Sequence, residues 1–258
     1  MSEHPRRPTA IVTGAGSEIG IGFAVATRLV ATGHAVIVAS TTERIHERVD
    51  ELRASGGDVA GFVGDLTFAS TARALVDTAV ETFGGLEVVV NNAGWTSQAQ
   101  PDSPAGAQHL SDEAWHGSIA RNLGSAFYVT RAALPHLGAA EYGRIVNVTS
   151  VSGTLVASAD DAGYHAAKAG MLGLTRSVAF DAGRDGITVN AVAPGWIATA
   201  SSTEWELRQG AATPVGRCGT PEEVASLICY LAGREASYVT GQLFVVDGGN
   251  CIVDGHAG

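Results

Sequence analysis

The first forty residues contain the pattern that most restricts how this chain can fold. A short apolar run with β-branched residues, Thr9 to Thr13, is followed by a glycine-rich segment from Gly14 to Gly22. A helical pattern then continues through Ala31, and Gly33 is placed to end that helix. The next run, Ala35 to Ala39, is typical of a buried parallel strand. Strand, glycine-rich turn, helix and strand in this order predict a βαβ unit.

The same alternation continues along the rest of the chain. Strand-like runs follow at 59–64, 86–90, 144–149, 187–192 and 242–246, and helical patterns at 42–55, 69–83, 111–137, 161–181 and 221–232. Seven strands with intervening helices predict an α/β fold of the Rossmann type, a doubly wound, seven-stranded parallel sheet with helices on both faces. Ligands of such sheets bind outside the carboxyl ends of the strands, so the loops that follow strands are expected to carry function.

Composition limits the remaining possibilities. With 258 residues, of which 45% are hydrophobic, the chain can form one large core, and we expect a single domain over 1–258 with tails at about 1–8 and 250–258. A net charge of −10 without a basic cluster argues against nucleic acid or an anionic membrane as partner. No apolar run approaches the length of a membrane span, and none near the start is typical of a signal peptide. The odd number of cysteines, without metal-ligand spacing, favours a cytoplasmic protein with no metal: Cys218, Cys229 and Cys251.

One tyrosine and one lysine form a candidate acid/base pair. Tyr164 and Lys168 stand four residues apart in an Ala-rich run, 162–176, that predicts a helix, so they share one face of it. Lys168 is the only lysine in the chain, among fifteen arginines. A nearby ammonium lowers the pKa of a phenol from about 10, which would make Tyr164 a proton donor and acceptor. For the bare pattern, a surface tyrosine and a solvated lysine are the better interpretation, so the other motifs must decide.

Further motifs occur in a characteristic order. They are Thr13-Gly14 with Gly20-Ile21-Gly22, Asp65-Leu66, Asn91-Asn92-Ala93-Gly94, Asn122-Leu123, Ser150, Tyr164 with Lys168, Pro194-Gly195, and Asp247-Gly248-Gly249. This ordered set resembles the classical short-chain dehydrogenase/reductase family over nearly the whole chain. The nearest group in it is the 3-oxoacyl-carrier-protein-reductase-like one.

The chain departs from that family at two places. Five residues, Ala15 to Ile19, stand between the Thr-Gly and Gly-Ile-Gly pieces, where the family usually has three. This puts Glu18 in the phosphate loop, where its charge is unfavourable unless it turns to solvent. The spacing from Ser150 to Tyr164 is one residue longer than the commonest, and Ser152 is the alternative to Ser150.

The resemblance implies a catalytic tetrad of Asn122, Ser150, Tyr164 and Lys168. In the family pattern Tyr164 exchanges a proton with the substrate oxygen, which Ser150 holds. Lys168 lowers the tyrosine pKa and bonds the nicotinamide ribose, while Asn122 holds a water that links Lys168 to solvent. Taken alone, Asn122 could instead satisfy a backbone group of its helix, and Ser150 could cap a turn.

The resemblance also implies a nicotinamide cofactor, with NADP(H) preferred and NAD(H) possible. The second strand ends in Ser40 instead of a carboxylate, and the hydroxyls that follow, with Arg44, could hold a 2′-phosphate. Glu18 and Glu43 argue for NAD(H). Helix capping is the alternative for Thr41, Thr42 and Asp65, and a solvated helix face for Arg44. The predicted cofactor contacts are Gly14, Ser17, Gly20, Ile21, Ser40, Thr41, Thr42, Arg44, Asp65, Leu66, Asn91, Ala93, Gly94, Tyr164, Lys168, Pro194, Gly195, Ile197 and Thr199.

The predicted partner is a small molecule, a ketone, a 3-oxoacyl group or a secondary alcohol. The family places its substrate loops at 95–110 and 198–214, where Trp95, Trp196 and Trp205 could line an apolar pocket or pack the loops themselves. The family also implies a homotetramer, or a homodimer, with helices 111–137 and 161–181 at an interface. Two other readings stay open: a non-catalytic nucleotide sensor, and an isomerase or dehydratase.

Overall fold

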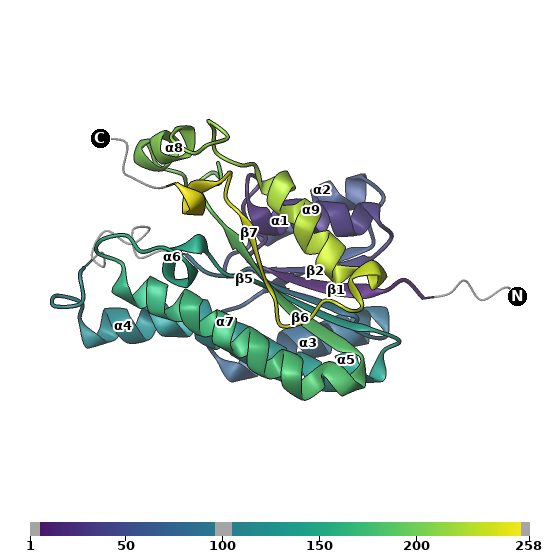
Figure 1. Cartoon of the computed structure of the whole chain (residues 1–258). Coiled ribbons are helices and arrows are strands. Elements are labelled where there is room, and N and C mark those ends of the chain that lie inside the picture. Colours follow the sequence, from purple (N-terminus) through teal and green to yellow (C-terminus); the bar gives the residue numbers. More distant parts are fainter. Residues whose placement is uncertain (1–5, 96–104, 254–258) are drawn as a thin grey trace, which may run out of the picture.

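A computed structural model describes residues 6–95 and 105–253, and its centre is one parallel sheet (Figure 1). The strand order is β3-β2-β1-β4-β5-β6-β7, so the direction of winding reverses between β1 and β4. The predicted seven-stranded Rossmann-type fold is therefore confirmed. The strands are β1 (Thr9–Thr13), β2 (Ala35–Ser40), β3 (Val59–Val63), β4 (Val88–Asn91), β5 (Gly143–Val148), β6 (Ile187–Pro194) and β7 (Leu243–Val246).

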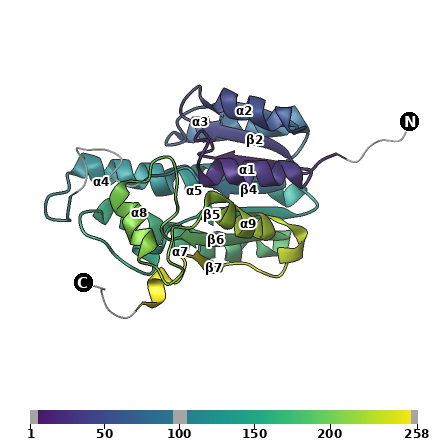
Figure 2. The same ribbon diagram turned by 90° about the horizontal axis from the view of Figure 1, so that it is seen from above.

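Helices cover both faces of the sheet. In Figure 1, α1, α2 and α9 lie above it and α3, α5 and α7 below, while α8 stands apart over the carboxyl ends of the strands; Figure 2 shows the upper layer from above. The helices are α1 (Ile21–Ala31), α2 (Ile45–Ala54), α3 (Ala69–Phe83), α4 (Asp112–Ile119), α5 (Ser125–Ala139), α6 (Val151–Thr154), α7 (Ala162–Ala182), α8 (Glu204–Ala211) and α9 (Pro221–Ala232).

The central strands are buried on both faces. In β1, Ala10 and Val12 belong to the core under α1 and α9, whereas Ile11 between them belongs to the core over α3 and α5. In β2, Ile37 likewise faces the second core. Successive side chains of a strand point to opposite faces, so a strand covered on both sides must be apolar throughout. This explains why the runs in the sequence are continuous and do not alternate.

The predicted long helix 111–137 is wrong as one regular helix. The chain forms α4, then a π-helical turn at Ala120–Gly124, then α5. In that turn the Ser125 amide donates to the carbonyl of Ala120, five residues back. The Asn122 side chain donates from Nδ2 to the Ser118 carbonyl, four residues back, at 3.2 Å. The sequence alone does not indicate this change of hydrogen-bond register.

Three other expectations need correction. α2 begins at Ile45, not at 42, and neither Thr41 nor Thr42 caps it, since its N-cap position is Arg44. The segment 198–214, expected as a loop, contains α8, whose start carries a reciprocal capping box between Thr203 and Glu206. The Thr-x-x-Glu spacing was the signal for this helix in the sequence. Within the predicted C-terminal tail, Asn250–Ile252 form a short 3₁₀ turn, in which the Cys251 amide donates to Asp247 Oδ2 at 2.7 Å.

Candidate active site

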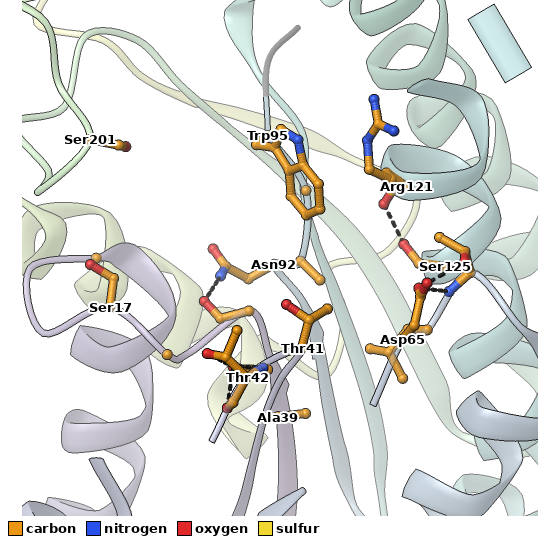
Figure 3. A pocket seen from close by; sticks show the side chains of 18 of the residues that line it. Ser17, Ala39, Thr41, Thr42, Asp65, Asn92, Trp95, Arg121, Ser125 and Ser201 are labelled. Carbon is orange, nitrogen blue, oxygen red and sulfur yellow. Dashed lines mark hydrogen bonds between the residues drawn. The ribbon is translucent and has the colours of Figure 1, made fainter. Parts of the chain in front are cut away.

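Two adjoining cavities lie at the carboxyl ends of the strands. The larger, of about 690 Å³, extends from the glycine-rich turn past the ends of β2 and β3 (Figure 3). The smaller, of about 230 Å³, contains Ser150, Tyr164 and Lys168. Residues shared by both linings make them one continuous cleft: Ile21, Asn92, Gly94, Thr199 and Ser201. The cleft opens where the winding of the sheet reverses, as the fold class predicts.

Close backbone contacts explain the glycines of the turn. Gly14 has a φ of +69°, and a Cβ there would lie 2.8 Å from the Ala93 Cα. A Cβ on Gly22 would lie 2.6 Å from the Gly14 carbonyl oxygen, so α1 can approach β1 only with glycine at this position. Gly20 precedes α1, and no described side chain caps the amides of its first turn. A backbone cradle with free amides at a helix N-terminus fits a pyrophosphate. Glu18 is exposed, as its charge requires.

The end of β4 holds this turn in place. Asn92 Nδ2 donates to the carbonyls of Thr13 and Gly14, both at 3.0 Å. Thr13 Oγ1 accepts from the backbone amides of Asn92 at 3.0 Å and Ala93 at 2.9 Å. These bonds join the loops after β1 and β4 directly, so Asn92 positions the glycine-rich turn.

Asn91, a predicted cofactor contact, lies below the cleft and does not line either cavity. Its Nδ2 donates to Thr130 Oγ1 at 3.0 Å and to Asn147 Oδ1 at 2.8 Å inside the molecule. The residue beside it, Asn92, lines both cavities. Asn92 was not selected from the sequence. Because neighbouring side chains of a strand point to opposite sides, only one of Asn91 and Asn92 could be expected to face the cleft.

The ends of β2 and β3 form the far wall of the larger cavity. Ser40, Thr41, Thr42 and Arg44 all line it, and Ser40 Oγ accepts from the Thr42 amide at 3.0 Å. Glu43 is absent from that lining and pairs with His46 at 3.0 Å. The wall is thus made of hydroxyls and one guanidinium at the place where a carboxylate would exclude a phosphate.

Asp65 and Leu66 close this wall at β3. Asp65 Oδ1 accepts from the Thr67 amide at 2.9 Å and from the Thr67 hydroxyl at 2.7 Å. The N-cap of α3 is Phe68, so the alternative interpretation of Asp65 as that cap is wrong. Asp65 instead shapes the turn before the helix and remains part of the cavity wall.

Tyr164 lies buried on α7 with its side chain hydrogen-bonded to Ser150. The pKa of Tyr164 is raised to about 12: burial raises it most, the Ser150 hydrogen bond lowers it, and the charges of Asp161 and Glu206 raise it. Lys168 is not among the causes of this shift, so its predicted lowering of the Tyr164 pKa stays a prediction. At this pKa the hydroxyl is protonated at neutral pH.

Lys168 is also buried, one helical turn along α7 from Tyr164. Its Nζ lies 5.6 Å from the centre of the Tyr164 ring and donates to the Val148 carbonyl at 2.8 Å. Burial lowers the pKa of Lys168 to about 8. The sequence prediction that both residues lie on one face of a helix is confirmed.

Ser150 follows β5 and caps the short helix α6. Its Oγ accepts from the Ser152 amide at 3.1 Å, so the turn-capping interpretation holds at the same time as the position in the cavity. Ser152, the alternative, lines the cavity too. The hydrogen bond to Tyr164 distinguishes Ser150 from it.

Asn122 is fully buried in the π-helical turn and lines neither cavity. Its Nδ2 donates to the carbonyls of Trp95 at 3.1 Å and Ser118 at 3.2 Å, while Oδ1 finds no hydrogen-bond partner among the described residues. A Cβ on Gly94 would lie 2.5 Å from this Oδ1 and 3.4 Å from Lys168 Nζ. A buried acceptor and an ammonium on either side of a glycine form a polar site suited to a water.

The substrate side of the cleft is formed by the segments after β6. Pro194, Gly195, Ile197 and Thr199 line the smaller cavity together with Trp196 and Trp205. The described part of the other predicted loop contributes Trp95, whose ring stacks with Arg121 at 5.3 Å. Residues 96–104 of that loop lie outside the described residues. Arg121 and Ser125 also line the larger cavity, and no motif in the sequence indicated them.

Among residues 6–95 and 105–253 no three histidine, cysteine, aspartate or glutamate side chains are grouped as a metal site. In the same part of the chain no helix is both long and apolar enough to cross a membrane.

Comparisons with known proteins agree on one family. The sequence profile described as "Enoyl-(Acyl carrier protein) reductase" matches residues 14–250. The chain is 38% identical over 250 residues to a cyclohexanol dehydrogenase of an Acinetobacter species, covering 96% of both chains. It is 36% identical over 244 residues to a 3-oxoacyl-acyl-carrier-protein reductase of Vibrio cholerae, covering 93% of this chain and 96% of the other. A crystal structure of an actinorhodin polyketide ketoreductase with NADPH superposes with a TM-score of 0.86 at 35% identity, covering 96% of this chain and 98% of the other.

Proposed function

Since this chain belongs to the classical short-chain dehydrogenase/reductase family and is an oxidoreductase, we propose that it transfers a hydride between NADP(H) and a ketone or secondary alcohol. The observation that carries the proposal is the buried Tyr164, hydrogen-bonded to Ser150 beside Lys168, at the inner end of a cleft that fits a dinucleotide. A 3-oxoacyl group also carries a ketone carbonyl, so it falls within the same proposal.

Each side chain of the site has a separate task in this proposal. The cofactor supplies the hydride at the carbonyl carbon. Ser150 Oγ and the Tyr164 hydroxyl bind the carbonyl oxygen, and Tyr164 gives that oxygen its proton. Lys168 holds a positive charge near the forming phenolate, and Asn122 Oδ1 holds a water through which Lys168 exchanges protons with solvent. Because the pKa of Tyr164 is raised to about 12, its protonated form predominates near neutral pH, so the hydroxyl can donate a proton to the carbonyl oxygen.

The preference for NADP(H) rests on the end of β2. Ser40, Thr41, Thr42 and Arg44 offer hydroxyls and one guanidinium to a 2′-phosphate, and Glu43 turns to His46. The ketoreductase whose fold superposes on this chain was crystallised with NADPH. NAD(H) is the alternative, which a comparison of the two dissociation constants decides.

We also propose a cytoplasmic homotetramer, with a homodimer as the alternative. All three cysteines are free thiols, which supports a reducing compartment. On α7, Phe180 is 88% exposed, and on α5 Phe127 is 39% exposed, so both helices of the predicted interface present aromatic side chains to solvent. Light scattering coupled to size-exclusion chromatography measures the assembly.

The test is Tyr164→Phe, with Tyr230→Phe on the exposed side of α9 as the matched control. We expect carbonyl reduction to fall by roughly 10²- to 10⁴-fold in Tyr164→Phe, while the NADPH dissociation constant stays the same, because only the proton donor is removed. Tyr230→Phe should retain full turnover. Turnover that survives in Tyr164→Phe would contradict the mechanism. NADPH binding without turnover on any carbonyl in the native protein would favour a sensing role, and consumption of substrate without net NADPH oxidation an isomerase or dehydratase.

A further inference from the structure

Two tryptophans form an aromatic corner in the smaller cavity. Trp196 follows β6 and Trp205 lies in α8; their ring centres are 5.3 Å apart and their planes meet at 90°. Both line the cavity that contains Tyr164. When two rings meet at a right angle, one can present its flat apolar face to a ligand and the other its edge. This arrangement fits another ring better than it fits a linear chain.

Backbone hydrogen bonds hold this corner in position. The Gly219 amide donates to the Trp196 carbonyl at 2.9 Å, and the Ala198 amide donates to the Gly219 carbonyl at 2.9 Å. The capping box between Thr203 and Glu206 fixes the first turn of α8, which carries Trp205. The corner is therefore formed in advance, so binding against it loses little conformational entropy.

The size of the cavity limits what can enter. Its volume of about 230 Å³ is smaller than the roughly 300–1,000 Å³ of sites for drug-sized ligands. The nicotinamide ring would take the part of this cavity beside Pro194, Gly195 and Ile197, so the space left beside Ser150 and Tyr164 suits a single ring that carries the reacting carbon. A long acyl chain would have to extend out of it.

The charges around the cavity are mainly negative. Asp161 and Glu206 line it, whereas Lys168 is the one cationic side chain among its described lining residues. Glu206 keeps its carboxylate in a fixed place, because the Thr203 amide donates to its Oε2 at 2.7 Å. Both acidic groups raise the pKa of Tyr164, so their field reaches the hydroxyl at which the reaction occurs. A carboxylate or phosphate on the substrate would be repelled here.

We infer that the substrate is a small, uncharged ketone or alcohol on a single ring, packed against Trp196 and Trp205, and not an acyl thioester. This inference rests on the proposed function, because it concerns the molecule to which Tyr164 gives its proton. It goes further in assigning substrate selection to the aromatic corner and to the fixed charge of Glu206.

The first experiment compares three carbonyl compounds with the native protein and NADPH: cyclohexanone, 4-oxocyclohexanecarboxylate and acetoacetyl-CoA. We expect kcat/KM to be highest for cyclohexanone, since the other two compounds carry negative charge. Highest activity on acetoacetyl-CoA, or on the carboxylate, overturns this inference and leaves the proposed function standing. Absence of turnover on all three, and on a wider panel of ketones, counts against the proposed function itself.

Variants then locate the selection. Trp205→Ala should raise KM for cyclohexanone by about tenfold, the loss expected for one aromatic contact, and Trp205→Phe should recover most of it. Trp115→Ala is the control, because Trp115 is exposed to a similar extent, 39% against 42% for Trp205, but lies outside both cavities. Equal effects of Trp205→Ala and Trp115→Ala would contradict a role for the corner.

Glu206→Gln tests the charge while it preserves the capping geometry, since glutamine also completes a capping box. We expect the ratio of kcat/KM for 4-oxocyclohexanecarboxylate to that for cyclohexanone to rise several-fold. Asp181→Asn, an acidic residue near the far end of α7 and outside both cavities, should leave this ratio unchanged. An unchanged ratio in Glu206→Gln would show that Glu206 does not select against anions.

Discussion

Two buried charged side chains, Glu87 and Lys168, lie at opposite edges of the sheet and have different surroundings. At the amino edge, Glu87 precedes β4 and is buried, and it accepts hydrogen bonds from the Arg6 guanidinium and, at 2.6 Å, from the Thr9 amide. At the carboxyl edge, Lys168 is buried with only the Val148 carbonyl as hydrogen-bond acceptor among the described residues. The same sheet therefore places a paired charge at one end and an almost unpaired one at the other.

A second cluster at the amino edge, around the buried Arg144, is also paired. The buried Arg144 donates to the carbonyls of Gly143 at 2.8 Å and Gly233 at 2.9 Å, and its guanidinium lies 5.1 Å from the centre of the Tyr142 ring. Arg234 stacks on the same ring at 4.4 Å. Two of the guanidinium nitrogens of Arg144 thus have carbonyl acceptors and both guanidinium groups lie against an aromatic face, an arrangement that stabilises a fold.

The carboxyl edge lacks this compensation. The pKa of Lys168 is lowered and that of Tyr164 is raised, in both cases mainly by burial, and Asn122 Oδ1 has no described partner. Perturbed pKa values and unsatisfied polar atoms are typical of sites that bind a ligand and transfer a proton. Substitutions at the carboxyl edge should therefore lower activity without lowering stability. Substitutions at the amino edge should lower stability without changing activity.

The largest effect should come from Lys168→Met, which keeps the length of the side chain and removes its charge. We expect activity to fall by at least about 10²-fold. The free energy of unfolding at pH 7 should rise, by at most ~3 kcal/mol, since the charged form of this lysine is disfavoured by burial. The lost bond to the Val148 carbonyl reduces the gain. Denaturant titration and steady-state rates measure the two effects.

The difference in the free energy of unfolding between Lys168→Met and the native protein should depend on pH. Below about pH 8 the lysine is protonated in both the folded and the unfolded chain, so the native protein bears the full cost of burial. Between pH 8 and 10.5 the folded chain loses the proton and the unfolded chain keeps it, so the native protein gains stability as pH rises. The difference between Lys168→Met and the native protein should thus shrink from pH 7 to pH 10. A gap independent of pH would mean that Lys168 is not desolvated in solution.

Arg6→Met should show the reverse pattern at the amino edge. It leaves the buried Glu87 carboxylate without its counter-ion, and we expect a loss of roughly 2–3 kcal/mol in the free energy of unfolding, less than for a fully buried pair because Arg6 is partly exposed. The rate constants should not change. Arg7→Met, on a neighbouring exposed residue, is the control. If Arg6→Met altered kcat as strongly as stability, the two edges would not be separate.

The smallest effects come from a matched pair of helix caps. Thr203 and Thr220 begin α8 and α9 with the same capping box. Thr220→Ala should lower the free energy of unfolding by about 1 kcal/mol, because α9 packs into the core between itself, α1 and the sheet. Thr203→Ala should instead raise KM with little change in unfolding, because only Gly210 of α8 is buried and the helix borders the substrate cavity. Equal loss of stability in both would contradict a local role for α8.

Much of the fold and of the candidate site could be predicted from the sequence. Apolar strand runs, helical periodicity and the glycine-rich turn are local patterns, and in a doubly wound sheet they suffice to place strand ends together. That Tyr164 and Lys168 share a face of a helix follows from their spacing alone. The π-helical turn around Asn122 was not predictable, since no local pattern of residues marks the change from four-residue to five-residue backbone hydrogen bonds.

The sequence by itself determined the order of the elements, the need for glycine at Gly14 and Gly22, and the set of side chains brought to the carboxyl edge. Only the tertiary structure decided that Asn92 and not Asn91 faces the cleft, and that Trp196 meets Trp205 at a right angle. It also decided the direction of the pKa shift of Tyr164. The physical reason is that desolvation and the electrostatic field at a group depend on which distant segments of the chain surround it. Short-range sequence patterns do not specify those segments.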